Sequence, residues 1–269
     1  MLIRGRAHKN EDLSRRHGGG GNEPAGETAA PPDELSEAIA NMSRSDWRLR
    51  VDGVRSLSKV VLNQSRGTYG ARSVSSGEVT TALDAIVPRL SDGNAKVAVE
   101  SLQALTSMFP VFRDSAAPCL GTVVPALAGA LGSTNDKVRQ QGEVAVDSLI
   151  GSVDSALLVP WFCQMATRTT SRSRPMMLDR LGELAGAVHA VAKPQLLAKH
   201  VLPAAISALN DNRGEARAAN HRLVRKLAAL MGNEFYEHAA TLAAGNQRRL
   251  AELVSTPPPS RDARDGSRY

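Results

Sequence analysis

The stretch Ala85–Leu105, AIVPRLSDGNAKVAVESLQAL, decides the fold of this chain. It begins with an aliphatic pair and a proline, passes through a polar turn, and continues into a second apolar segment that starts with a basic residue. Two later stretches follow the same order, TVVPALAGALGSTNDKVRQQGEVAVDSL at 122–149 and KHVLPAAISALNDNRGEARAANHRL at 199–223. A pattern that recurs in this way is the mark of a repeat protein.

Within and around these stretches the apolar residues recur at three- and four-residue spacing, which predicts helices. One such stripe consists of Val51, Val54, Leu57, Val61 and Leu62. A second consists of Val97, Leu102, Leu105 and Phe109, and a third of Val138, Ala145, Leu149 and Ile150. Alternating runs typical of strands are hard to find, so we expect an all-α protein.

The prolines of the repeated stretches give the period of the repeat. Pro88, Pro125, Pro160 and Pro203 are separated by 37, 35 and 43 residues. This spacing is typical of HEAT-type helical hairpins, which bury their apolar faces only against neighbouring hairpins. We therefore expect an α-solenoid of about five hairpins and a closing helix. The expected hairpins span about 33–63, 78–110, 115–151, 154–192 and 196–231, and the closing helix spans about 233–254.

The two ends of the chain differ from this helical region in composition. Residues 1–32 and 255–269 are rich in Gly, Pro and charge without apolar periodicity, so we expect a disordered leader and tail around one domain at 33–254. The polar segment Ser65–Gly77 is expected to link the first two hairpins. The first residues lack an apolar signal core, and no run approaches the roughly 20 apolar residues of a membrane span. We therefore expect an intracellular, cytoplasmic protein.

Composition and motifs argue against an enzyme. The 269 residues include only two cysteines, Cys119 and Cys163, which we expect to be buried thiols. His189, His200, His221 and His238 fall on predicted helices without companions at ligand spacing, and are expected to be surface or boundary residues. Neither a catalytic triad nor a glycine-rich phosphate loop is found. We predict no catalytic residues, no metal and no cofactor.

The turns inside the hairpins carry basic residues, although the net charge of the chain is only +6. In a solenoid these turns line up along one edge, so a binding surface is read as a row of turn residues. The row contains Arg48, Arg50, Asn94, Lys96, Lys137, Arg139, Arg168, Arg172, Arg174, Arg213 and Arg217. Each one alone could be a solvated or helix-capping residue. Five consecutive basic turns favour a ligand-binding edge.

Trp47 stands out in the first of these turns, SRSDWRLRVDGV. Asp46 is a plausible N-cap, which places the Trp47 ring at the first turn of the following helix. The ring could simply pack the end of the repeat, or it could be the apolar anchor of a binding site. The sequence around it does not decide between these two roles.

A Trp followed by basic residues in the first turn, with Asn and Lys or Arg in the later turns, resembles the TOG domain, a tubulin-binding HEAT solenoid. The resemblance covers about 33–254 and is greatest to TOG domains of CLASP proteins and of the TOG array regulators of axonemal microtubules. It is carried by SDWRLRVDGV at 45–54, VPRLSDGNAKVAVESLQAL at 87–105, FPVFRDSAAPCL at 109–120 and KPQLLAKHVLPAAISALNDNR at 193–213.

The resemblance implies that the row of turns docks on the acidic αβ-tubulin dimer or the microtubule lattice. Trp47 is then expected to insert against β-tubulin. Its supporting residues are Arg50, Asn94, Lys96 and Lys137, while Arg213 and Arg174 are expected toward α-tubulin. The expected tubulin-binding set also includes Arg139 and Arg217. The family also implies a cytoskeletal setting, with the cilium or axoneme and other ciliary or microtubule-associated partners as further expectations. Neither membrane nor nucleic acid is an expected partner.

Two other functions are compatible with a helical solenoid. A generic HEAT scaffold would hold protein partners through its concave face, independently of Trp47. An RNA-binding solenoid would need stacking aromatic side chains along its groove, but the chain has only nine aromatic residues. Replacing Trp47 by Ala separates tubulin binding from scaffold binding, and competition with RNA tests the third function.

Overall fold

The computed structural model describes residues 34–66, 74–168 and 172–255. All of them belong to one compact unit, Pro32–Tyr269. The expected leader at 1–32, the tail apart from Ser255, and the middle of the Ser65–Gly77 linker lie outside the described residues.

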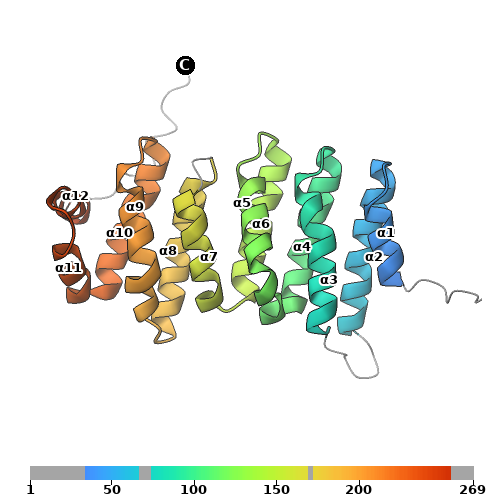
Figure 1. Cartoon of the computed structure of the whole chain (residues 1–269), viewed down its shortest axis with the longest axis horizontal. Helices are drawn as coiled ribbons and strands as arrows, with labels where there is room; N and C mark the ends of the chain where they lie inside the picture. The colour runs from blue at the N-terminus through green and yellow to red at the C-terminus, as the bar shows by residue number, and fades with distance from the viewer. Residues whose placement is uncertain (1–33, 67–73, 169–171, 256–269) are drawn as a thin grey trace, which may run out of the picture. The chain divides into compact units, whose positions relative to one another are not determined.

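The described residues form helices and the turns between them, which confirms the all-α prediction. Five helical hairpins follow one another along the chain (Figure 1). Their first helices are α1 (Glu34–Met42), α3 (Ser76–Ile86), α5 (Leu120–Leu131), α7 (Ser155–Arg168) and α9 (Leu202–Ser207). Their second helices are α2 (Trp47–Arg66), α4 (Ala95–Phe112), α6 (Asp136–Ser152), α8 (Arg174–Ala190) and α10 (Gly214–Met231).

Short segments complete the first helices of three hairpins. The 3-10 segment η1 (Val87–Ser91) follows α3, and η2 (Arg113–Cys119) precedes α5. The fifth hairpin begins with the π-helical segment η3 (Leu197–Val201), and the 3-10 segment η4 (Ala208–Asn210) follows α9. The four prolines that gave the repeat period all lie in first helices or their extensions, which explains their regular recurrence.

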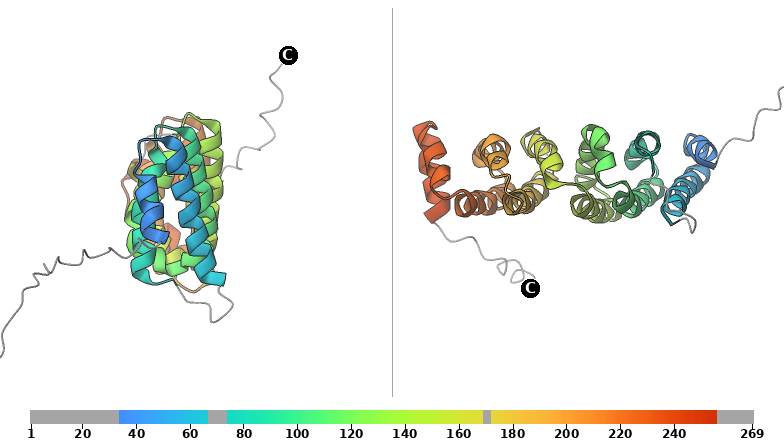
Figure 2. Two further views of the ribbon diagram at one scale, coloured as in Figure 1. Left: turned by 90° about the vertical axis from the view of Figure 1, so that its right-hand side faces the viewer. Right: turned by 90° about the horizontal axis from the view of Figure 1, so that it is seen from below.

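The helices form two layers (Figure 2). The first helices lie in one layer and the second helices in the other, and the core fills the space between them. This core is mainly Leu, Val and Ala, together with all four phenylalanines, Phe109, Phe112, Phe162 and Phe235. It runs through all five hairpins as one cluster. Each hairpin is therefore stabilised by burial against its neighbours.

Packing is uneven along the second layer. Here α4 packs against both α2 and α6, and α8 packs against α10. The third and fourth hairpins meet mainly through α5 and α7 in the first layer. Between α6 and α8, Asp147 and Arg180 form an ion pair of 2.6 Å. Within the described residues, α6 and α8 thus pack against each other less than the other neighbouring second helices do, and this ion pair crosses between them.

The end of the domain differs from the prediction of one closing helix at 233–254. Two helices are present, α11 (Asn233–Ala240) and α12 (Ala244–Ser255). Between them the side-chain amide of Gln247 donates to the carbonyl oxygens of Ala240 and Leu242, at 3.0 and 2.7 Å. Side chains thereby satisfy backbone groups where the helix stops. The change of direction lets α12 pack against α10 and bury Leu250.

One apolar stretch differs from the expectation of no membrane-length segment. By length and composition alone, Ala95–Leu131 is apolar enough to cross a membrane. In the structure it comprises α4, η2 and α5, which belong to both layers, and half of its most apolar window is buried inside the domain. The hydrophobic core of the solenoid accounts for its composition.

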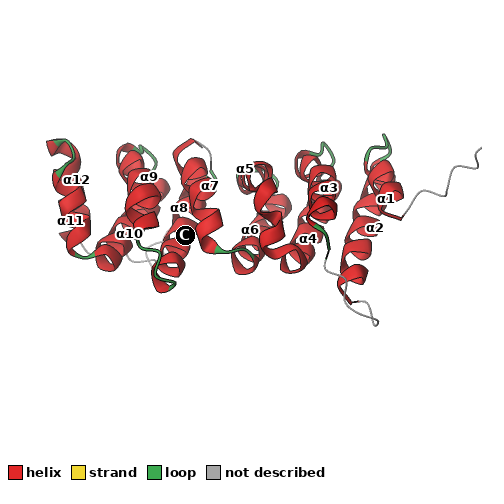
Figure 3. Cartoon of the chain, turned by 60° about the horizontal axis from the view of Figure 1, so that its bottom comes forward, coloured by secondary structure: helices red, strands yellow, loops and turns green. Residues whose placement is uncertain are grey.

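The fully described turns within hairpins lie at one edge of the row, the upper edge of Figure 1, and the described connections between hairpins lie at the other (Figure 3). This follows from the alternating direction of successive helices. Residues near 46, 93, 134 and 212 are thereby brought to one edge, as the sequence predicted.

Gly53 tests the packing of the first hairpin. A Cβ atom at this position would lie 2.7 Å from both the carbonyl oxygen of Ala38 and the amide nitrogen of Met42. Because both atoms belong to the backbone of α1, Gly53→Ala should lower the free energy of unfolding by about 1–3 kcal/mol. Gly129→Ala is the matched control, since it lies in α5 with no atom within 4 Å of its Cβ position. Chemical denaturation measures both, and equal effects would contradict the packing described.

Candidate tubulin-binding edge

The first three second helices begin in the same way, at a polar side chain that caps the helix. The backbone N–H of Arg48 donates to Asp46 (2.9 Å), that of Lys96 to Asn94 (2.9 Å), and that of Lys137 to Asn135 (3.0 Å). In each case the basic residue stands two positions after the cap. The three basic residues therefore occupy the same place in three successive turns, and the predicted N-cap Asp46 is confirmed.

Trp47 is half-buried at the start of α2. The Lys96 Nζ atom lies 4.7 Å from the centroid of the indole ring, and the Arg48 guanidinium carbon lies 4.9 Å from it. Both distances fall within the range of cation–π attraction, which contributes about 0.5–1 kcal/mol at exposed sites. Trp47 is thus oriented at the edge by two cations, one of them from the next hairpin.

A groove with a volume of about 590 Å³ opens beside this ring. Val51, Ala95 and Val99 give it apolar walls, and Arg48, Lys96 and Lys137 place cations around it. Arg55 also lines the groove, but its guanidinium is engaged with Glu100 at 2.9 Å. Three predicted contact residues, Trp47, Lys96 and Lys137, therefore meet at one groove. It fits an apolar side chain flanked by carboxylates.

Arg50, another predicted contact residue, points into the structure. Its side chain is only 14% exposed, and its Nε and one terminal nitrogen donate to the two carboxylate oxygens of Asp92 at 2.8 and 2.9 Å. The other terminal nitrogen donates to the carbonyl oxygens of Arg44 and Ser45 at 3.0 and 2.7 Å. Arg50 therefore joins the first turn to the second.

Arg174 makes a similar contact with fewer hydrogen bonds at the other end of the row, where its buried Nε has no hydrogen-bond partner. Its side chain is also 14% exposed, and it donates to Asp211 at 2.6 Å and to the carbonyl oxygen of Thr167 at 2.7 Å. It thus joins the fourth turn to the fifth. Residues 169–171 of the fourth turn lie outside the described residues.

Asn94 and Arg139 are also engaged within the chain. Asn94 caps α4 through its side-chain oxygen. Arg139 lies in α6 at the same helical position as Arg50 in α2, and it donates to the carbonyl oxygen of Ser133 at 3.0 Å and to Asp136 at 2.5 Å. Both of its partners belong to its own turn.

Arg213 and Arg217 lie exposed around the fifth turn. A second groove of about 470 Å³ lies beside them, lined by Arg217, Asn220 and Arg249 among others. Arg249 comes from α12 and donates to Asn210 and, at 3.3 Å, to the carbonyl oxygen of Leu209. The sequence-based prediction missed this residue, because it treated 233–254 as one helix without a place at the edge.

Asp92 and Asp211 were also missed, although both lie in the polar turns that defined the repeat. Burial raises the pKa of Asp92. The hydrogen bonds from Arg50 and the Asn94 N–H, together with the charges of Arg50 and Arg89, lower this pKa by more than burial raises it. Burial also raises the pKa of Asp211. The hydrogen bonds from Arg174 and the Arg213 N–H, together with the charges of these two arginines, lower this pKa by more than burial raises it. Both pKa values therefore fall below the usual value for Asp.

Both cysteines and one of the four histidines named in the sequence, His221, are buried. Cys119 and Cys163 are free and buried as predicted, and burial raises the pKa of Cys163 to about 12. His221, expected at the surface or boundary, is instead buried against α12, with Nε2 2.6 Å from the carbonyl oxygen of Leu253. His238 pairs with Glu234 at 3.7 Å. Across the described ranges, no group of three His, Cys, Asp or Glu residues could hold a metal.

Comparison with known proteins gives no matching family model. In sequence, the chain is 25% identical over 223 residues to TOG array regulator of axonemal microtubules protein 1 of Homo sapiens, a match that covers 79% of this chain. The chain spans 12% of the length of that relative.

The fold is similar to that of solved TOG domains. The TOG domain of Zyg9 from C. elegans gives a TM-score of 0.62 at 16% identity, covering 82% of this chain and 80% of that domain. Crescerin, described as using a TOG domain array to regulate microtubules in the primary cilium, gives a TM-score of 0.59 at 18% identity, covering 83% and 88%. The predicted solenoid of TOG type and the resemblance to TOG domains are thereby confirmed.

The two depressed carboxylate pKa values predict acid sensitivity. Because each folded-state pKa lies below the unfolded value of about 3.9, ionisation stabilises the fold above that value, and this contribution is lost as the pH falls through the folded pKa. The free energy of unfolding should therefore fall less between pH 6 and pH 2 in Asp92→Asn and Asp211→Asn than in the wild type. Urea titrations at each pH measure this difference. A pH dependence as steep as that of the wild type in both variants would contradict the assignment.

Proposed function

We propose that this chain, which has the fold of a TOG domain, is a non-enzymatic protein that binds αβ-tubulin or the microtubule lattice through its row of intra-hairpin turns. The observation that carries the proposal is Trp47, a half-buried ring at the edge, beside a groove with Lys96 and Lys137. The similarity to TOG array proteins in sequence and fold supports the choice of partner.

The groove at Trp47 is proposed to receive β-tubulin. Its apolar walls and cations suit a partner that offers an apolar side chain among carboxylates. A desolvated Trp contributes about 2 kcal/mol or more at an interface, whereas an exposed ion pair contributes roughly 0.2–1 kcal/mol. Trp47 should therefore dominate the affinity, and Lys96 and Lys137 should set orientation and association rate.

The exposed arginines of the fifth turn, Arg213 and Arg217, are proposed to contact α-tubulin. Arg249 lies beside them and extends the cationic surface onto α12. Contacts at both ends of the row would make one domain span the two subunits of a dimer and fix its orientation.

We also propose that the protein regulates microtubule assembly or stability and acts in the cilium. These proposals rest on the relatives, one of which is named as a regulator of axonemal microtubules and another as regulating microtubules in the primary cilium. Where several such domains are linked, each raises the effective concentration of the others at the tubulin surface.

Trp47→Ala tests the proposal directly. Loss of the ring should weaken binding to purified αβ-tubulin by about 30-fold or more, as expected for an interface hot spot. Analytical ultracentrifugation or fluorescence titration measures the change. Trp161→Ala is not a suitable control, because that ring packs against Gly121 in the first layer. Arg222→Ala is suitable, since Arg222 pairs with Asp179 away from the turn edge. Unchanged binding in Trp47→Ala would refute the proposal.

The cations of the groove should act through charge. Lys137→Glu should slow association and flatten its salt dependence, because ionic screening weakens the attraction between the exposed edge and an acidic partner. Lys59→Glu makes the same charge change on the same layer, within α2 and away from the turns. Stopped-flow association at two salt concentrations compares them. Equal effects of the two substitutions would mean that net charge, not the turn edge, drives the encounter.

A further inference from the structure

Arg50 lies one helical turn after Trp47, and its side chain is 14% exposed. Its guanidinium donates four hydrogen bonds, two to the Asp92 carboxylate and two to backbone carbonyls of the first turn. The Asp92 side chain is only 4% exposed. A partner could bind this guanidinium only after these hydrogen bonds break, because they engage it within the chain.

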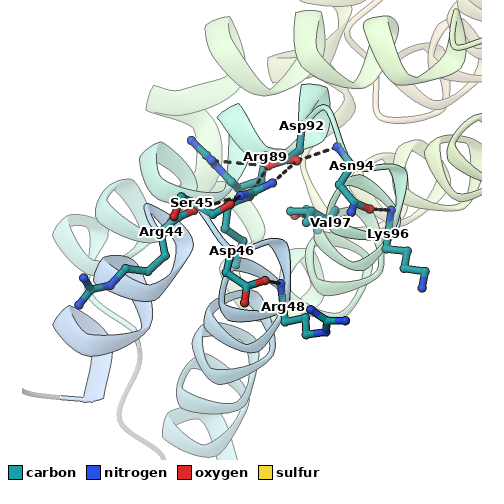
Figure 4. Close-up of polar contacts among 11 residues, drawn as sticks. Arg44, Ser45, Asp46, Arg48, Arg89, Asp92, Asn94, Lys96 and Val97 are labelled. Carbon is teal, nitrogen blue, oxygen red and sulfur yellow. Dashed lines mark hydrogen bonds and ion pairs between the residues drawn. The ribbon is translucent and has the colours of Figure 1, made fainter.

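The bonds continue from Asp92 through Asn94 to the backbone of Lys96 (Figure 4). One Asp92 oxygen also accepts the backbone N–H of Asn94 at 2.9 Å, and the Asn94 side-chain oxygen accepts the N–H of Lys96 at 2.9 Å. Lys96 then places its ammonium 4.7 Å from the centroid of Trp47. Because Arg50 and Trp47 are on α2, this network is closed: it begins and ends on one helix and passes through the neighbouring turn.

The same device occurs at the far end of the row. Asp211 accepts from Arg174 and from the backbone N–H of Arg213 at 2.9 Å, just as Asp92 accepts from Arg50 and from Asn94. Arg213 is an exposed residue that the proposed function assigns to the partner. In both places a buried carboxylate links an arginine of one hairpin to a residue at the binding edge of the next.

We propose that Arg50 with Asp92, and Arg174 with Asp211, are positioning pairs that set the spacing of adjacent turns before a partner binds. The inference rests on the proposed function, and it moves Arg50 and Arg174 from the contact surface to the support beneath it. Two half-sites result, one around Trp47 and one around Arg213. Preorganised side chains lose less conformational freedom on binding, so the pairs raise affinity without touching the partner.

The first test needs no partner. In a Trp161→Phe background the emission of the protein reports Trp47, because the chain has two tryptophans. Asp92→Asn should shift this emission in the same direction as Lys96→Ala, which removes the ammonium directly. Asp179→Asn is the matched control: it breaks the two-bond contact with Arg222 between α8 and α10, at 2.9 and 2.7 Å, away from the turns. An unchanged emission in Asp92→Asn, with helical circular dichroism intact, would overturn the proposal.

The second test measures affinity for αβ-tubulin at a temperature where every variant is folded. Arg50→Gln and Asp92→Asn should each weaken binding by about tenfold through loss of preorganisation, and their combination should weaken it little further, since both break one pair. Arg50→Lys keeps the charge but not the planar fork, so it should fall between the wild type and Arg50→Gln. Asp179→Asn should bind like the wild type. An equal loss in Asp179→Asn, or additive losses in the double variant, would overturn the positioning role.

The two tests separate this inference from the proposed function. If Trp47→Ala binds tubulin as tightly as the wild type, the proposed function fails, while the emission of Trp47 still decides whether Asp92 holds Lys96 in place. If Trp47→Ala loses binding and Arg50→Gln does not, the function stands and the positioning pair is refuted.

Discussion

Each hairpin of this chain has apolar faces that only neighbouring hairpins can cover, and the rest of the structure depends on this constraint. Burial against neighbours forces the hairpins into a row with two layers. Since the chain reverses direction at every turn, the row collects all intra-hairpin turns at one edge. Residues as distant in sequence as Trp47 and Lys137 then share one groove.

Hydrophobic packing brings the turns to the same edge but does not by itself fix them to one another, because apolar contacts have little directional preference. The hydrogen bonds of the two Arg–Asp pairs are directional, unlike these apolar contacts. They occur between the first and second turns and between the fourth and fifth, whereas Arg139 of the third turn bonds within its own turn. Beside this third turn, α6 and α8 pack weakly against each other, and the Asp147–Arg180 ion pair crosses between them. The edge thus has two parts in which an Arg–Asp pair joins neighbouring turns, the first with the second and the fourth with the fifth. These two parts are connected through the packing of the first layer.

The sequence predicted the hairpins, their order and the edge, because helical period and repeat spacing are local signals. The sequence-based prediction failed where a side chain forms a hydrogen bond with a residue far away in the sequence. Arg50 and Asp92 are 42 residues apart. The residues around Arg50 therefore did not indicate that its side chain pairs with a carboxylate and is not free to contact a partner. The position of Trp47, Lys96 and Lys137 at the edge was predictable, because the helix caps beside them are local in sequence. The break between α11 and α12 escaped prediction, since packing on α10 decides it.

We propose that the intra-hairpin turns, and not another face of the solenoid, contact tubulin. Hydrogen exchange of the chain with and without αβ-tubulin tests it most directly. Protection is predicted in segments 43–50, 92–97, 133–139 and 211–217, with the connections at 113–119, 153–155 and 192–196 unchanged. Protection confined to those connections, or to the outer faces of the helices, would contradict the claim.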